Sequence, residues 1–204
     1  MALQQAFYKK NFKGFIETVP AYASLAVFYD VAEVKKNYVV TTSAYEFVKS
    51  FTEQLISKIN DADETAKRLP IHIPVYYNGE DLADVARQHQ LSVEEVIRIH
   101  TGKPYLVYMI GFLPGFAYMG KVDERISTAR HATPRTHVKP GSVGIAGFQT
   151  GIYPLESPGG WQLIGQTPLL IFDTKKESPC LLQAGDTIQF ISISKTDFEK
   201  LNEY

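Results

Sequence analysis

The stretch GFQTGIYPLESPGGWQLIG, residues 147–165, combines chain-breaking and core-forming residues to an unusual degree. It holds five of the fourteen glycines, two of the eleven prolines and the only tryptophan, with apolar side chains placed between them. We interpret it as two short strands, 151–156 and 161–165, around a tight SPGG turn. Gly159 and Gly160 would take positive φ values in that turn, and Pro158 would fix its entry.

Short strands of the same kind surround this stretch. Many short strands separated by glycine and proline turns favour a sandwich or a barrel over an alternating βαβ sheet. A capping box at Ser92–Glu95 starts a helix that should end near Gly102, and Ser194 should cap a terminal helix. The further predicted strands are 71–77, 105–112, 142–147, 168–172 and 187–193.

The first part of the chain has a different pattern. Residues 17–30 are predicted to be one strand. A helix follows over 42–60, with an apolar stripe of residues four apart: Phe47, Phe51, Leu55 and Ile59. The charged segment 61–70 reads as a linker. The predicted class is therefore α+β, with an N-terminal α/β domain over 1–68 and a β domain over 69–204.

Composition excludes several classes of function. The formal charge of −1 over 204 residues gives no electrostatic footprint for nucleic acid. Cys180 is the only cysteine, which rules out an intrachain disulfide. The sequence shows no leader and no apolar run of about 18 residues, so we expect a soluble cytoplasmic protein that binds neither nucleic acid nor membrane.

Familiar cofactor motifs are not found. Gly141, Gly144 and Gly147 do not form a P-loop or a dinucleotide fingerprint, so ATP binding by this chain alone is not expected. His131 and His137 flank a basic loop, but no third ligand accompanies them, and we predict no metal site.

Two polar residues are candidates for chemistry. Arg135 lies between a proline and a threonine and can present its guanidinium to a carboxylate, or it can simply be an exposed solubilising residue. Glu156 suits an acid or base in a pocket wall, although a single glutamate proves nothing. Ser157 precedes a proline, which favours a turn role over a nucleophilic one.

A second glycine- and proline-rich segment, GFLPGFAYMG at 111–120, also carries aromatic residues. Such residues either cap the barrel or line a concave site. Residues 111–120, 132–147 and 149–173 together resemble the Kip-inhibitor family, also called allophanate hydrolase subunit 1. Its bacterial members are understood as the B subunit of an ATP-dependent 5-oxoprolinase.

The resemblance implies a fold and a function. It implies an N-terminal α/β domain and a C-terminal cyclophilin-like β-barrel. Family members usually open with a further strand, which in this sequence is either missing or divergent. With the A and C subunits, the B subunit hydrolyses 5-oxo-L-proline, a small lactam, to L-glutamate, and the assembled complex uses ATP. The isolated chain is expected to be inactive.

The resemblance also implies a site. Arg135 would bind substrate charge, and Glu156 would polarise or transfer a proton. The cleft facing the partner would be lined by Phe112, Pro114, Gly115, Phe116, Gln149, Tyr153, Ser157 and Trp161. One alternative is inhibition of a sporulation histidine kinase, the role of the family's original member. Allophanate hydrolysis is less favoured, because its serine-containing amidase signature is absent here.

Overall fold

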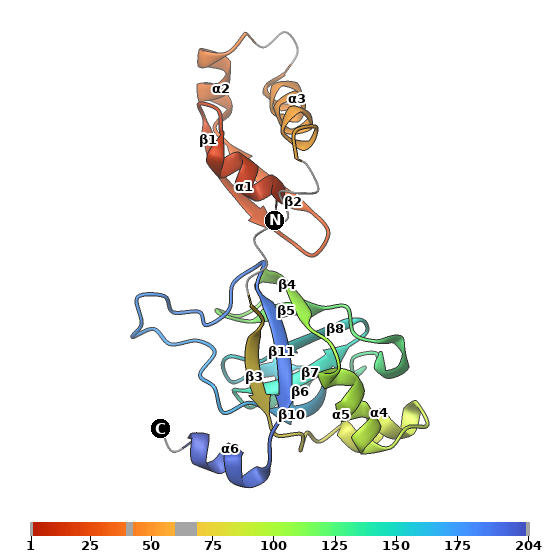
Figure 1. Cartoon of the computed structure of the whole chain (residues 1–204). Coiled ribbons are helices and arrows are strands. Elements are labelled where there is room, and N and C mark those ends of the chain that lie inside the picture. The colour runs from red at the N-terminus through yellow and green to blue at the C-terminus, as the bar shows by residue number, and fades with distance from the viewer. Residues whose placement is uncertain (1, 40–42, 60–68, 203–204) are drawn as a thin grey trace. The chain divides into compact units, whose positions relative to one another are not determined.

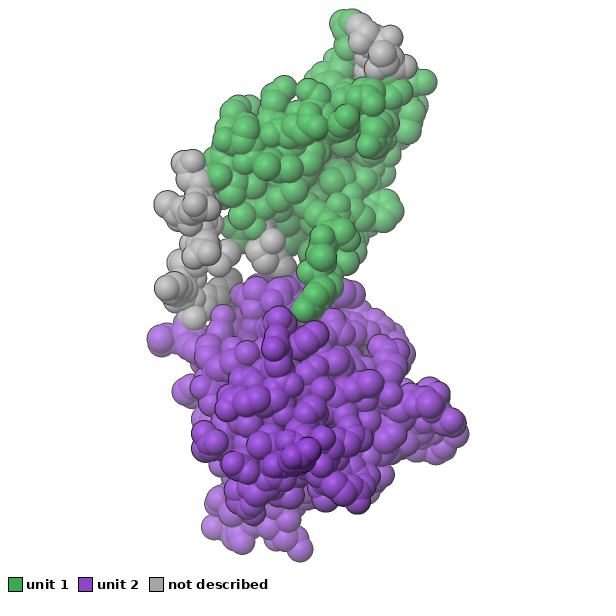
Figure 2. Space-filling view, turned by 90° about the vertical axis from the view of Figure 1, so that its right-hand side faces the viewer, with its two compact units in different colours: residues 1–68 green, residues 69–204 purple. Residues whose placement is uncertain are grey.

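The structure is a computed structural model that describes residues 2–39, 43–59 and 69–202. The chain divides into two compact units, residues 1–68 and 69–204, which Figure 2 shows in green and purple. Most of the predicted linker, residues 61–68, lies outside the described residues. The two units are described separately below.

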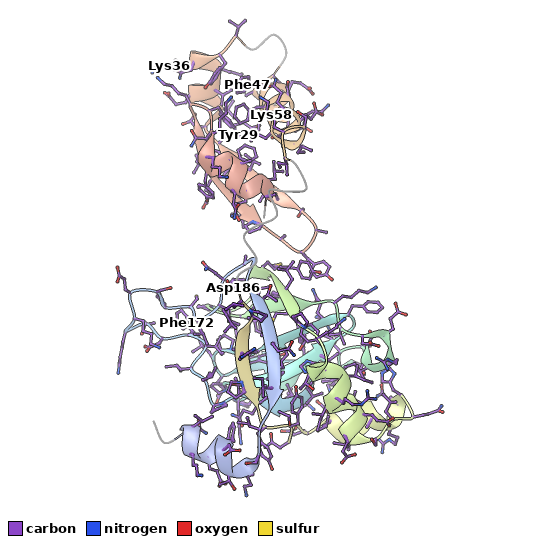
Figure 3. The ribbon with its side chains drawn as sticks, viewed as in Figure 1. Tyr29, Lys36, Phe47, Lys58, Phe172 and Asp186 are labelled. Carbon is purple, nitrogen blue, oxygen red and sulfur yellow. The ribbon has the colours of Figure 1, made fainter. Side chains whose placement is uncertain are left out.

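The N-terminal unit is a β-hairpin packed against three helices. Its elements are α1 (Ala2–Lys9), β1 (Phe15–Pro20), β2 (Leu25–Tyr29), α2 (Val31–Asn37) and α3 (Ala44–Ile56) (Figure 1). Its core is aromatic: Phe12 packs against Phe47 and Tyr29 at ring-centroid distances of 5.7 and 6.3 Å, and Figure 3 labels the last two residues.

Two predictions for this unit need correction. Residues 17–30 are not one strand, because the Ala21 N–H donates to the Ser24 carbonyl and reverses the chain between β1 and β2. The reversal contains Tyr22 between two alanines and no glycine, so it does not interrupt the apolar pattern on either side. The predicted helix over 42–60 ends at Ile56, so Ile59 lies beyond the stripe that Phe47, Phe51 and Leu55 share.

The second unit is built on a seven-stranded sheet in the order β10-β7-β8-β5-β4-β11-β3. Tyr76, directly after β3, exchanges two 2.9 Å backbone hydrogen bonds with Gln166 at the end of β10, so the two edges of the sheet meet and a barrel nearly closes. The predicted α+β class with a β-barrel is confirmed. The strands are β3 (Ile71–Val75), β4 (Tyr105–Ile110), β5 (Ala117–Gly120), β7 (Ser142–Ala146), β8 (Gln149–Ile152), β10 (Gln162–Gln166) and β11 (Thr187–Ser192).

Helices and a two-stranded ribbon complete this unit. As predicted, the capping box of Ser92 and Glu95 begins one helix, Gly102 caps its end, and Ser194 accepts a hydrogen bond at the start of the last helix. The remaining elements are α4 (Leu82–Gln88), α5 (Val93–Thr101), the short 3₁₀ helix η2 (Glu124–Ile126), β6 (Arg135–Val138), β9 (Ser157–Gly159) and α6 (Lys195–Asn202).

The SPGG segment is not the predicted turn. Ser157–Gly159 forms β9, which pairs with β6, and neither Gly159 nor Gly160 has a positive φ. Gly159 serves a different purpose, because a Cβ at this position would collide with the hydroxyl of Tyr153. The predicted strand over 151–156 ends at Ile152, and 168–172 forms only an isolated bridge at Phe172.

A buried polar chain crosses the barrel core. The Tyr77 hydroxyl lies 2.8 Å from Nδ1 of His100, and Nε2 of His100 lies 3.0 Å from the Thr150 hydroxyl. That hydroxyl donates to the Gly144 carbonyl, so Nε2 must donate to Thr150, and Tyr77 donates to Nδ1. Burial lowers the pKa of His100 to about 3, which keeps the imidazole neutral.

We expect this histidine to make the barrel less stable in acid. Between about pH 6.5 and 3 the unfolded chain binds a proton that the folded chain does not, so the free energy of unfolding falls by about 1.4 kcal/mol per pH unit. Urea unfolding followed by Trp161 fluorescence at pH 7.5 and 5.0 should therefore show a loss of about 2 kcal/mol from this residue.

The variant His100→Gln should lose correspondingly less between the two pH values. His72→Gln, which removes an exposed histidine, is the matched control and should behave like the parent chain. An equal loss in His100→Gln and in the parent would contradict the assignment.

Candidate functional site

The two glycine- and proline-rich segments meet in one aromatic cluster: Phe112, Phe116, Tyr118, Tyr153 and Trp161. The Phe116 ring is at its centre, 5.3 Å from Trp161 and 5.2 Å from Tyr153, both nearly perpendicular to it. Such edge-to-face pairs each contribute about 0.5–1.5 kcal/mol beyond their area burial. Predicted site residues from two segments far apart in the sequence thus come together.

The loop between β4 and β5 presents Phe112 on the surface. Its φ is +70°, and the Leu113 N–H donates to the Gly111 carbonyl, which defines a γ-turn centred on Phe112. A type II turn follows, with Pro114 second and Gly115 third at φ +81°. The Phe112 side chain is 63% exposed although its backbone is strained.

The other members of the aromatic cluster are packed inside. Phe116, Tyr153 and Trp161 are buried, and Tyr118 is half-buried. Burial raises the pKa of Tyr153 and of Tyr118, so both hydroxyls keep their protons at neutral pH. Within this chain the cluster is therefore a small core with one exposed aromatic residue rather than an open cleft.

Each of the three guanidinium nitrogens of Arg135, on β6, has a hydrogen-bond partner. Nη2 lies 2.5 Å from Oδ1 of Asp81, Nε lies 3.3 Å from Oε2 of Glu80, and Nη1 donates to the Trp161 carbonyl at 3.3 Å. Its partner Asp81 has a side chain only 6% exposed. Arg135 thus joins the start of α4 to the segment that carries the tryptophan.

Asp81 is the residue that sequence reasoning missed. Besides Arg135, it accepts a 2.6 Å hydrogen bond from the Leu163 N–H, and Nε2 of His131 lies 3.2 Å from Oδ1 without hydrogen-bond geometry. A Cβ on Gly79 would collide with the Leu163 backbone, so glycine there permits this approach. Asp81 and Arg135 are 54 positions apart, and no local pattern connects them.

Glu156 has a different environment. Its Oε1 lies 3.2 Å from Nδ1 of His137, and both side chains are well exposed. In the ribbon of β6 and β9, Arg135 pairs with Gly159 and Val138 with Ser157, so Glu156 and Arg135 lie at opposite ends. The structure does not bring the two proposed catalytic residues into contact.

The remaining predicted residues are scattered around the aromatic cluster. Gln149 is half-buried on β8, Pro114 is exposed, and buried Gly115 packs against the Phe172 ring. The Ser157 hydroxyl is buried without a hydrogen-bond partner among the described residues. Two surface hollows lie elsewhere, one between α1 and α3 and one along residues 170–181.

Neither a metal-ligand cluster nor a membrane-spanning helix is found in the described part of the chain. Within residues 2–39, 43–59 and 69–202, no three histidine, cysteine or acidic side chains gather as metal ligands would. Over the same ranges, every helix is too short or too polar to cross a membrane.

A family model and a bacterial relative both match most of this chain. A family model described as the carboxyltransferase domain, subdomain C and D, matches residues 1–182. The 5-oxoprolinase B subunit of Bacillus subtilis is 48% identical over 199 residues, which are 96% of this chain and 82% of that protein.

Two solved structures also resemble this chain over nearly its whole length. A conserved uncharacterized protein from Pyrococcus horikoshii is 41% identical, with a TM-score of 0.61 over 96% of this chain and 87% of that one. The urea carboxylase of Kluyveromyces lactis, at 19% identity and a TM-score of 0.67, shares the fold over 99% of this chain and 20% of its own. The chain therefore belongs to the carboxyltransferase C and D family and, within it, to the group that contains the 5-oxoprolinase B subunits.

Proposed function

We propose that this chain is the B subunit of an ATP-dependent 5-oxoprolinase, which hydrolyses 5-oxo-L-proline to L-glutamate together with the A and C subunits. The observation that carries the proposal is the 48% identity to the Bacillus subtilis protein over nearly the whole chain. The chain contributes no nucleotide-binding motif of its own, so ATP is handled elsewhere in the complex. The isolated chain is accordingly proposed to be inactive.

The aromatic cluster is the proposed meeting place with the partner subunit. Exposed aromatic residues are enriched at the centres of protein interfaces, and Phe112 is held outward by a strained backbone. Exposed Glu156, with His137 beside it, is available for proton transfer to a bound lactam. Arg135 is bound to Asp81, which favours a positioning role over direct contact with substrate.

Inhibition of a histidine kinase is the other candidate function. The similarity to the 5-oxoprolinase B subunit of Bacillus subtilis supports 5-oxoprolinase activity and gives no support to kinase inhibition. No contact in the described residues favours it.

Assembly tests the proposal and the role of Phe112 together. We expect the tagged chain to co-purify with the co-expressed A and C subunits, and Phe112→Gly to weaken that association by about tenfold or more. Glycine relieves the positive φ at a gain of about 1 kcal/mol, which offsets the lost ring contact, so stability should change by less than about 1 kcal/mol.

Tyr45→Ala is the matched control, because it removes an exposed aromatic side chain from the N-terminal unit. A folded chain that fails to co-purify with either of the other subunits would argue against the proposed function. Normal assembly by Phe112→Gly would argue only against the role of Phe112.

A further inference from the structure

A surface hollow of about 180 Å³ lies between α1 and the end of α3 in the N-terminal unit. Its apolar lining comes from Ala2 and Ala6 of α1 and from Leu55 and Ile59. The two alanines are four positions apart and therefore lie on the same face of α1. Because each carries only a methyl group, α1 leaves the space opposite Leu55 unfilled.

The charged part of the lining is entirely basic. Lys9, Lys10 and Lys58 line the hollow, and none of them pairs with an acidic side chain among the described residues. The first sixteen residues of the chain include no aspartate or glutamate. Glu53, the last acidic residue of α3, does not line the hollow and lies two positions from Leu55, a spacing that places it on another face of the helix. The hollow thus presents uncompensated positive charge beside an apolar surface.

The size and shape of the hollow favour a protein segment as its occupant. Small-molecule pockets have volumes of roughly 300–1,000 Å³. A hollow of about 180 Å³ is smaller and suits one bulky apolar side chain. A helix that binds a lipid surface presents its apolar face outward. The Phe7 ring of α1 is instead fully buried in the core of the unit.

We propose that this hollow binds an acidic segment of a partner protein. One bulky apolar side chain of the segment fills the space beside Ala6 and Leu55. Carboxylates on either side of it pair with Lys9, Lys10 and Lys58. The apolar side chain supplies affinity, and the complementary charges select the partner. The inference is carried by residues of the N-terminal unit alone and does not depend on the proposed function.

The test measures binding of the full chain to short fluorescent peptides by fluorescence anisotropy. The probe is a synthetic helical peptide of glutamate and leucine, with its leucines three and four positions apart. The comparison peptide has lysine in place of every glutamate. We expect saturable binding of the acidic probe and binding of the basic peptide that is weaker by about tenfold or more.

Two variants assign the binding to the hollow. Lys9→Glu combined with Lys58→Glu replaces attraction by repulsion and should raise the dissociation constant of the acidic probe by about tenfold or more. Ala6→Leu keeps every charge but fills the hollow, so it should weaken binding by roughly tenfold as well. Far-UV circular dichroism checks that both variants are folded.

Lys36→Glu combined with Lys49→Glu is the matched control. It changes the net charge by the same amount, at two lysines that do not line the hollow. These lysines form exposed ion pairs with Glu33 and Glu46. The dissociation constant of the acidic probe should change by less than about twofold in this control.

Several results would overturn the inference. It fails if the acidic probe does not bind the parent chain, or if the basic peptide binds equally well. Equal weakening in the control and in the Lys9 and Lys58 variant would indicate a general effect of net charge. Unchanged binding in folded Ala6→Leu would show that the hollow is not used. Stronger binding to vesicles of phosphatidylcholine and phosphatidylglycerol than to the probe, lost in the Lys9 and Lys58 variant, would assign the surface to lipid instead.

Discussion

Replacing Asp81 by asparagine is expected to lower the free energy of unfolding of the barrel unit by about 3–5 kcal/mol. The Asp81 carboxylate is buried, and it binds both the Arg135 guanidinium and the Leu163 N–H. Removing its charge leaves Arg135, whose side chain is mostly buried, without its main compensation. Urea unfolding followed by the fluorescence of Trp161, the only tryptophan, reports on this unit.

A double-mutant cycle identifies the pair as the cause. Asp81→Asn combined with Arg135→Met should destabilise the unit by at least about 1 kcal/mol less than the sum of the single changes. Asp84→Asn, which breaks an exposed ion pair with Arg87 on the same helix, should cost no more than about 1 kcal/mol. Additive single effects, or a small effect of Asp81→Asn, would show that the buried pair does not hold this segment.

Trp161→Ala should have an effect of similar size, about 3–5 kcal/mol, because it empties the middle of the aromatic cluster. The indole is buried against Phe116 and Tyr118 at centroid distances of 5.3 and 5.9 Å. Two neighbours of the indole, Gly144 and Gly151, carry no side chain that could fill the space it leaves. Both lie so close to Trp161 that an added Cβ would come within 3.1 Å of its side chain.

The unfolding of Trp161→Ala is measured by far-UV circular dichroism, because this variant lacks the tryptophan that supplies the fluorescence signal. Trp161→Phe keeps an aromatic ring and should lose less stability than Trp161→Ala. A loss below about 1 kcal/mol in Trp161→Ala would mean that the indole is not a packed member of the cluster.

The fold could be predicted where local patterns carry the information. The capping box of Ser92 and Glu95 and the glycine at 102 define both ends of α5, because each signal acts within a few residues. Short apolar runs between glycines and prolines indicated a sandwich or a barrel, and the family resemblance implied the barrel. The hairpin within 15–29 was missed, because a reversal that contains Tyr22 and no glycine leaves the apolar pattern continuous.

The wrong predictions for the segments around Trp161 also have a physical cause. Two adjacent glycines usually mark a turn, but Gly159 is required by the approach of the Tyr153 hydroxyl, a contact that sequence cannot show. Residues 168–172 contribute Ile171 to the core but leave Leu170 exposed, and they form an irregular segment with one isolated bridge rather than a strand.

The residue types of the candidate site could be predicted from the sequence, but the contacts between those residues could not. Aromatic residues in two glycine-rich segments suggested either a barrel cap or a concave site, and the family resemblance implied one cleft lined by both segments. The two segments meet at Phe116. The binding of Arg135 by Asp81 depends on tertiary structure over 54 positions, which no local sequence pattern reveals. Whether Arg135 is exposed or bound to a carboxylate can be decided only when its partner is seen.

Glutamate release by the reconstituted complex tests the proposed activity most directly. This chain is purified together with the A and C subunits, and L-glutamate is measured after addition of 5-oxo-L-proline and ATP. We predict ATP-dependent glutamate formation by the three-subunit complex, and none when this chain or ATP is omitted. No glutamate from a verified three-subunit complex, or undiminished glutamate without this chain, would contradict the proposed function.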